Sequence, residues 1–113
     1  MKRIRIWTGD DGESHFEEHP IAFGDGDRPA ADSDPAEAIQ FRLRRGGTAL
    51  DFHPAPRRQY VLYLTARVRI GCGDGSSVIM EPGDVLQAED TTGRGHTSTI
   101  LTEGVCAFVP LVG

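Results

Sequence analysis

Hydrophobic and polar residues alternate with a period of two along much of this chain. The alternation is clear at residues 3–7, 41–45 and 59–71, where it predicts β-strands with one buried face. Further short strands are expected at residues 77–80, 85–89, 96–101 and 105–111. A bend near Ala66 is expected to divide the longest run into two strands. Many short strands of this kind predict an all-β sandwich or barrel.

Turn sequences separate the predicted strands. Residues 72–76 read Cys-Gly-Asp-Gly-Ser, and an Asp-Gly pair readily takes the positive φ of a tight hairpin. Residues 81–84 read Glu-Pro-Gly-Asp, which is typical of a turn because proline presets φ at its first central position. The range 90–95 is expected to be a loop. These turns place successive strands next to each other and favour antiparallel pairing.

Helical signals are weak and confined to one segment. Asp34 is a candidate N-cap, Pro35 suits a first helical turn, and Glu37 adds a favourable charge, so one or two turns are expected there. The preceding residues 24–35 are polar and rich in Gly, Pro and Asp, which predicts a flexible surface loop. A lid over a pocket is the alternative for this loop. Residues 12–18 predict a solvated edge segment, or a strand packed across a dimer.

Composition narrows the class of protein. The 113 residues suit a single domain, and 12 basic against 17 acidic side chains leave a net charge of −5, which argues against a nucleic-acid binder. No apolar run is long enough to span a bilayer, and residues 1–12 lack the apolar stretch of a signal peptide. Cys72 and Cys106 lie in apolar runs without CxxC spacing and are expected to be buried thiols. A cytoplasmic location fits these features.

The spacing of one histidine and its neighbours resembles the first sequence motif of the cupins. That motif reads Gly-x5-His-x-His-x3-Glu-x6-Gly. Here Gly47 is followed after five residues by His53, while Ala55, Gln59 and Ala66 stand where the second His, the Glu and the closing Gly would be. The spacing is kept although three of the residue types differ.

A second stretch resembles the other cupin motif. Gly83 begins it, Gly93 and His96 follow in a loop two residues longer than the motif, and Thr91 and Ile100 replace its Pro and Asn. Residues 12–18, 52–60 and 82–96 also resemble a subgroup of short bacterial cupins without an assigned reaction. The resemblance implies a cupin-type double-stranded β-helix, a jelly-roll barrel, preceded by an N-terminal strand segment. Residues 1–113 would form one cupin domain, with N-terminal strands over 1–45 and the barrel motifs over 46–111.

The resemblance implies a degenerate metal site. Cupins typically bind a divalent metal through the motif His and Glu residues, and this chain keeps His53 and His96 with Gln59 as a neutral amide donor. Without a carboxylate the affinity for Zn, Ni, Mn or Fe is expected to be weak, and a site without metal is nearly as well supported. Asp51 or Asp90 could add a carboxylate. Each histidine could instead be an ordinary hydrogen-bonded residue.

The same positions outline a small-molecule site. His53 and His96 are the candidate catalytic residues, since imidazole titrates near neutrality. The candidate substrate-binding residues are Arg57, Gln59, Tyr63 and Asp90. Alternation within the strand places Arg57 on the same inward face as Gln59, where its guanidinium would hold an anion. Tyr63 could instead be a core residue, and Arg57 a rim residue paired with Glu89 or Asp90.

Three functions follow from this site. The first is an acid–base isomerase, cyclase or lyase acting on a small anionic metabolite. The second is a non-catalytic ligand-binding or sensory module, and the third is a filled barrel without a ligand. The apolar outward half of residues 60–64, the exposed sheet edges and the family resemblance together predict a homodimer.

Overall fold

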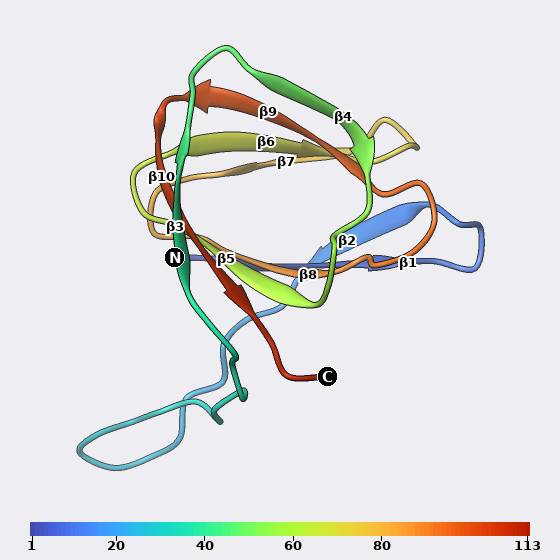
Figure 1. Cartoon of the computed structure of the whole chain (residues 1–113). Coiled ribbons are helices and arrows are strands. Elements are labelled where there is room, and N and C mark those ends of the chain that lie inside the picture. The colour runs from blue at the N-terminus through green and yellow to red at the C-terminus, as the bar shows by residue number, and fades with distance from the viewer.

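The chain folds entirely into β-strands and connecting loops. A computed structural model describes all 113 residues and contains ten strands and no helix (Figure 1). The predicted all-β class is therefore confirmed, and no segment forms a helix able to cross a membrane. The strands are β1 (Arg3–Thr8), β2 (Ser14–Glu18), β3 (Gln40–Arg44), β4 (Ala49–His53), β5 (Gln59–Tyr63), β6 (Arg67–Gly71), β7 (Ser77–Met80), β8 (Val85–Glu89), β9 (His96–Thr102) and β10 (Gly104–Pro110).

The strands form two mostly antiparallel sheets that face each other. One sheet has six strands in the order β2-β1-β8-β5-β10-β3, and the other has four in the order β4-β9-β6-β7. From β3 onward the chain passes between the sheets at nearly every connection, and only β6 and β7 follow each other within one sheet. In Figure 1 the β4 and β9 ribbons lie above β5 and β8, with space for side chains between the layers.

The strands predicted from alternation are present. The long run divides near Ala66 into β5 and β6. Residues 72–76 form the turn from β6 to β7, in which the Cys72 amide donates a hydrogen bond to the Ser76 carbonyl. Inward-facing apolar side chains from both sheets form one core, as period-two burial requires. Both thiols are buried and unpaired, and burial raises the pKa of each to about 11. The core side chains are Ile4, Ile6, Ala55, Val61, Tyr63, Ala66, Val68, Ile70, Cys72, Met80, Leu86, Ala88, Ile100 and Cys106.

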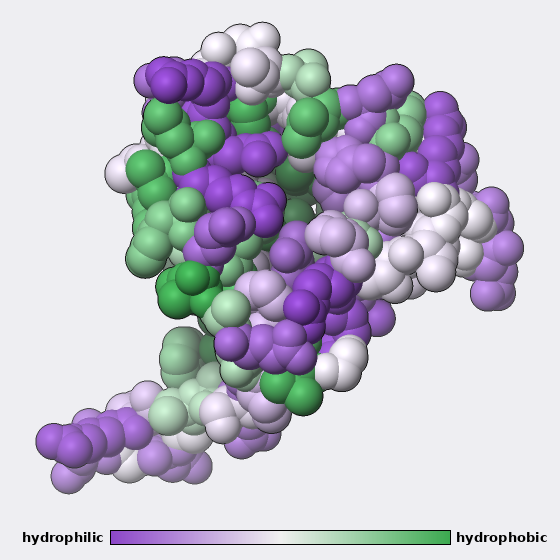
Figure 2. All heavy atoms as spheres, in the orientation of Figure 1, coloured by the Kyte–Doolittle hydropathy of each residue, from purple (hydrophilic) through white to green (hydrophobic).

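The helix expected near Asp34 does not form. The backbone around it pairs elsewhere: Glu37 donates to the Pro110 carbonyl, Val112 donates to the Pro35 carbonyl, and Ala36 bridges Leu111. These long-range bonds use the groups that a helical turn would need. The preceding loop projects away from the sheets (Figure 1), and its tip is mostly hydrophilic (Figure 2). It contributes no side chain to the cavity between the sheets, while Ala31, Asp32 and Asp34 line a separate surface pocket.

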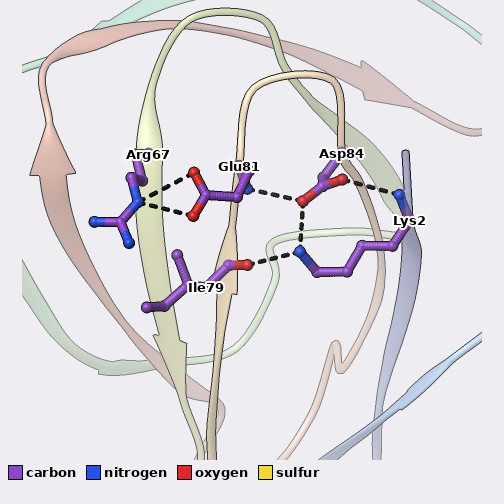
Figure 3. A network of polar contacts seen from close by, with 5 residues as sticks. All are labelled: Lys2, Arg67, Ile79, Glu81 and Asp84. Atoms are coloured by element: carbon purple, nitrogen blue, oxygen red, sulfur yellow. Dashed lines mark hydrogen bonds and ion pairs between the residues drawn. The ribbon is translucent and has the colours of Figure 1, made fainter.

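Strands β1 and β2 widen the larger sheet. Strand β1 pairs in parallel with β8, and β2 pairs antiparallel with β1 within the same chain and forms the edge. A polar network fastens β1 at its start (Figure 3). The Lys2 ammonium donates to Asp84 Oδ2 at 2.5 Å and to the Ile79 carbonyl at 2.8 Å, and the Lys2 amide donates to Asp84 Oδ1 at 2.9 Å. The network joins β1 to the β7–β8 turn.

Asp84 is the centre of that network and is almost fully buried. Burial alone raises the pKa of its carboxyl, but hydrogen bonds from Lys2 and from the Glu81 amide outweigh burial and leave the pKa below its usual value of 3.8. A lowered pKa in the folded state contributes stability that is complete above 3.8 and is lost as the pH falls through the lower folded value.

We expect Asp84→Asn to lower the free energy of unfolding by about 1–3 kcal/mol at pH 7, because a charge-assisted acceptor is lost. Urea unfolding of the native chain and the variant between pH 2 and 7 measures the effect. The difference should shrink as the pH falls below 3.8 toward the lower folded pKa, because the carboxyl is protonated first in the unfolded chain and only at lower pH in the folded one. Glu18→Gln, at an exposed position of β2, is the matched control and should change stability by less than about 0.5 kcal/mol. A pH-independent loss in Asp84→Asn would contradict the role of its charge.

Candidate functional site

A cavity of about 220 Å³ lies between the two sheets. Its apolar floor comes from inward positions of β5, β6, β8 and β10. Its polar lining groups include His53, His96, Gln59 and Ser98, with Tyr63 among the more apolar residues. The cavity therefore combines an apolar wall with a few convergent polar groups, which is typical of small-molecule sites.

The two candidate histidines meet in this cavity. His53 ends β4 and His96 begins β9, and the two residues lie directly opposite each other in the antiparallel pair. Their ring centroids are 4.8 Å apart and the ring planes are inclined by 56°. Gly95 permits this approach, because a Cβ at its position would lie 2.0 Å from the carbonyl carbon of His53. The glycine before His96 is thus part of the site.

His96 is held from behind by a buried carboxylate. Its Nδ1 lies 2.6 Å from Asp90 Oδ2, and the Ser14 hydroxyl donates to the same oxygen at 2.7 Å. All three side chains are buried, and Asp90 has no exposed surface. An ionised carboxylate only accepts hydrogen bonds, so His96 Nδ1 carries a proton. Its Nε2 has no protein hydrogen-bond partner and remains available on the cavity side.

His53 is oriented in a similar way. Its Nδ1 lies 2.7 Å from the Asp51 backbone carbonyl, which can only accept, so Nδ1 is the protonated nitrogen. Nε2 of His53 has no protein partner either. The two rings therefore present basic nitrogens at one cavity, each fixed by a hydrogen bond on the opposite side of its ring.

Gln59 and Tyr63 lie on the inward face of β5 and line the cavity, as their spacing predicted. Both are buried. Burial raises the pKa of the Tyr63 phenol, so the phenol stays protonated at neutral pH and can donate a hydrogen bond. Asp90 does not line the cavity. It reaches the site only through His96, which makes it a positioning group rather than a direct contact for a ligand.

The expectation that Arg57 faces inward is wrong. Strand β5 begins at Gln59, so Arg57 lies in the preceding bend, where strand alternation does not apply. Its guanidinium pairs with Glu37 and donates to the Leu111 carbonyl. The next residue, Arg58, pairs with Glu89. Neither arginine lines the cavity.

Two arginines and one serine at or beside the cavity were not among the residues assigned to the site from the sequence, although Arg42 and Arg44 belong to a local arginine cluster that left an anionic ligand possible. Arg42 and Arg44 of β3 line the cavity, while Phe41 and Leu43 between and beside them are exposed. This strand reverses the usual rule that apolar side chains face inward. Ser14, at the start of β2, was also not assigned. Its only signal in the sequence was a small polar residue at an inward position of a strand.

The donor set does not fit a resident metal ion. No group of three His, Cys, Asp or Glu side chains is arranged to hold one. Ala55 occupies the wall where a third imidazole would be needed, and Asp51 is exposed with its Oδ1 accepting from the Phe52 amide. His53, His96 and Gln59 supply two neutral nitrogens and an amide oxygen, whereas stable catalytic zinc sites use three protein ligands of greater donor strength.

None of the family models, curated proteins or solved structures compared with this chain matches it. The choice of a function for the cavity therefore depends on its own geometry.

We expect the native chain to bind Zn²⁺ only weakly, with a dissociation constant of roughly 10 μM or more. Ala55→His with Gln59→Glu adds an imidazole and a carboxylate to the cavity wall and should tighten binding at least about tenfold. Isothermal titration of tag-free protein measures both. His53→Ala in the double-variant background is the control and should reverse the gain. Equally tight binding by the native chain would mean that its ligand set is already complete.

Proposed function

We propose that this chain is a small cupin-type jelly-roll domain that binds a small molecule and carries out acid–base chemistry with His53 and His96. The pair of facing imidazoles, one of them backed by a buried carboxylate, is the observation that supports the proposal. The reaction class is isomerisation, cyclisation or elimination, in which a proton leaves one atom of the ligand and is returned to another.

Strand order supports the jelly-roll assignment. Strands β3 to β10 give two four-stranded sets, β8-β5-β10-β3 and β4-β9-β6-β7. In a double-stranded β-helix the chain winds between two such sheets, and loops distant in sequence meet at one end of the barrel. The two motif histidines lie at paired ends of β4 and β9, where that winding brings them together.

His96 is the stronger candidate for the general base. Asp90 fixes its Nδ1 proton and stabilises the imidazolium that forms when Nε2 takes a proton. Ser14 satisfies the same carboxylate oxygen and holds it in place. His53, 4.8 Å from His96 between ring centroids, can return the proton to a neighbouring atom of the ligand.

The alternative is a binding module without catalysis. The same cavity could hold a ligand through Gln59, Tyr63 and the imidazoles with no proton transfer. The buried Asp90 favours the acid–base function, because its charge stabilises the imidazolium that forms when His96 takes a proton, and binding alone forms no imidazolium. Proton exchange on a bound ligand distinguishes the two.

We expect the protein to catalyse deuterium incorporation at the acidic carbon of at least one enolisable acid, tested with pyruvate, 2-oxoglutarate and acetoacetate in D₂O by ¹H NMR. His96→Gln should lower that rate roughly 100-fold or more, which is the usual contribution of a general base. Asp90→Asn should lower it by a smaller factor and shift the imidazole ¹⁵N signals of His96 toward the other tautomer. His19→Gln, at an exposed histidine, is the control. A rate of deuterium incorporation that is unchanged in His96→Gln would contradict the proposed acid–base function.

A second copy of the chain is the proposed partner. Strand β3 is a free sheet edge, and Phe41, Ala107 and Leu62 form an apolar row across the outer face of β3, β10 and β5. Phe41 is 65% exposed and Leu43 beside it is 52% exposed. Exposed apolar side chains on an unpaired edge favour association.

Sedimentation velocity should give a dimer for the native chain and a monomer for Phe41→Glu, because the variant places a charge in the apolar row. Arg69→Glu, on the exposed face of β6, is the control and should remain dimeric. A native chain that sediments as a monomer at tens of micromolar protein would contradict this association.

A further inference from the structure

Two guanidinium groups line the cavity without a carboxylate partner. Five arginines form ion pairs with Asp or Glu, namely Arg5, Arg57, Arg58, Arg67 and Arg94. Of the six that form none, only Arg42 and Arg44 line the cavity, and Arg44 is partly buried. A charge at the wall of a partly apolar cavity is costly unless an opposite charge joins it.

Arg42 is exposed at the mouth of the cavity, but two contacts hold its guanidinium in position. Its guanidinium carbon lies 3.9 Å from the centre of the Phe108 ring, and its Nε donates to Gln40 Oε1 at 2.7 Å. Stacking and this one hydrogen bond leave the terminal nitrogens without protein partners. The planar group is thus preorganised, with donors available for a ligand.

Arg44 adds a second positive charge near the same wall. Its guanidinium carbon is 5.8 Å from the Phe108 ring centre. Burial raises the pKa of both Tyr63 and Cys106, and the Arg44 charge opposes that rise in each case. The positive field of Arg44 therefore extends to the floor of the cavity.

The strand register separates the arginines from the histidines. Cys106 lies opposite both Arg42 and Tyr63, while Gln59 lies opposite Ala88 near the end of β8. Asp90, which holds His96, follows directly after β8. Phe108, whose ring lies under Arg42, pairs with Val61 of β5. Val61 is two residues, or roughly 7 Å, along β5 from Gln59. Arg42 itself pairs at the Tyr63 level, four residues or roughly 13 Å along the sheet from Gln59, but its guanidinium lies over the Phe108 ring. A ligand of a few carbon atoms can reach from that ring to the level of Gln59.

We propose that Arg42 and Arg44 form an oxyanion clamp, which binds the carboxylate or phosphate of a small ligand while the rest of that ligand extends toward His53 and His96. The inference rests on the proposed function and adds the ligand's chemical class and its direction in the site. A cavity of about 220 Å³ suits a small acid, since drug-sized sites are roughly 300–1,000 Å³.

The charge distribution of the whole chain agrees with this clamp. The net charge is −5, so most of the surface repels anions. Arg42, Arg44 and Arg45 gather positive charge on and beside β3, at the edge of the larger sheet. A local positive region on an acidic protein directs an anion to that place rather than to the surface in general.

Binding of succinate, pyruvate and inorganic phosphate, with neutral succinamide as the uncharged comparison, tests the clamp by isothermal titration. We expect at least one anion to bind the native chain, succinamide to bind at least tenfold more weakly than succinate, and Arg42→Gln with Arg44→Gln to weaken anion binding at least tenfold. Arg69→Gln removes the same charge from the outer face of β6 and should bind as the native chain does. Phosphate bound in preference to both carboxylates would identify a phosphate ligand for the same clamp.

Three results would overturn the clamp: no anion binds, succinamide binds as well as succinate, or the double variant binds as the native chain does. Arg42→Lys keeps the positive charge but loses the paired N–H donors of the guanidinium, so it should weaken anion binding less than Arg42→Gln does. The outcome is separate from the acid–base function. Deuterium exchange that needs His96 but not the arginines would leave the function standing without the clamp, and arginine-dependent binding without exchange would leave the clamp in a binding module.

Discussion

The buried carboxylate of Asp90 is the constraint on which the site depends. A carboxylate without solvent contact needs hydrogen bonds to replace its lost hydration, and Asp90 Oδ2 receives two, from Ser14 and His96, while its buried Oδ1 has no partner. Its backbone carbonyl also accepts from the Ala55 amide. One residue thus ties β2, the connection after β4 and the start of β9 to the end of β8. The same contacts that hold these segments together also set the orientation of the His96 ring.

The N-terminal strands are therefore part of the site and not only an addition to the sheet. Strand β1 pairs in parallel with β8 and buries Ile4 and Ile6, and Lys2 fastens it to Asp84 in the β7–β8 turn. Strand β2 can then place the Ser14 hydroxyl against the Asp90 carboxylate that orients His96. Loss of this sheet edge would remove a hydrogen bond from a carboxylate that cannot reach water, so packing at the edge and the orientation of the His96 ring are linked.

Strand β3 shows how one edge can carry two kinds of surface. Alternation directs Arg42 and Arg44 to the cavity and Phe41 and Leu43 to the outside, the reverse of an ordinary half-buried strand. The arrangement is tolerable on the inner side because Arg42 stacks on Phe108 at the border of an open cavity. On the outer side it leaves apolar side chains in water. Both departures from the usual pattern point to binding, of an anion inside and of a protein surface outside.

The sequence by itself determined most of the strands and the turns, whereas the meeting of His53 and His96 was expected only from the family resemblance. Period-two alternation, Gly and Pro turns and motif spacing are local signals, and the physical preferences behind them survive in the fold. Only the tertiary structure decided that Arg42 and Arg44, rather than Arg57, face the cavity, because alternation shows that neighbours point to opposite sides but not which side is the interior. Tertiary pairing also replaced the expected helix near Asp34, since the backbone there bonds to residues 110–112. The support of Asp90 by Ser14 joins residues 76 positions apart, and no local pattern encodes a contact of that range.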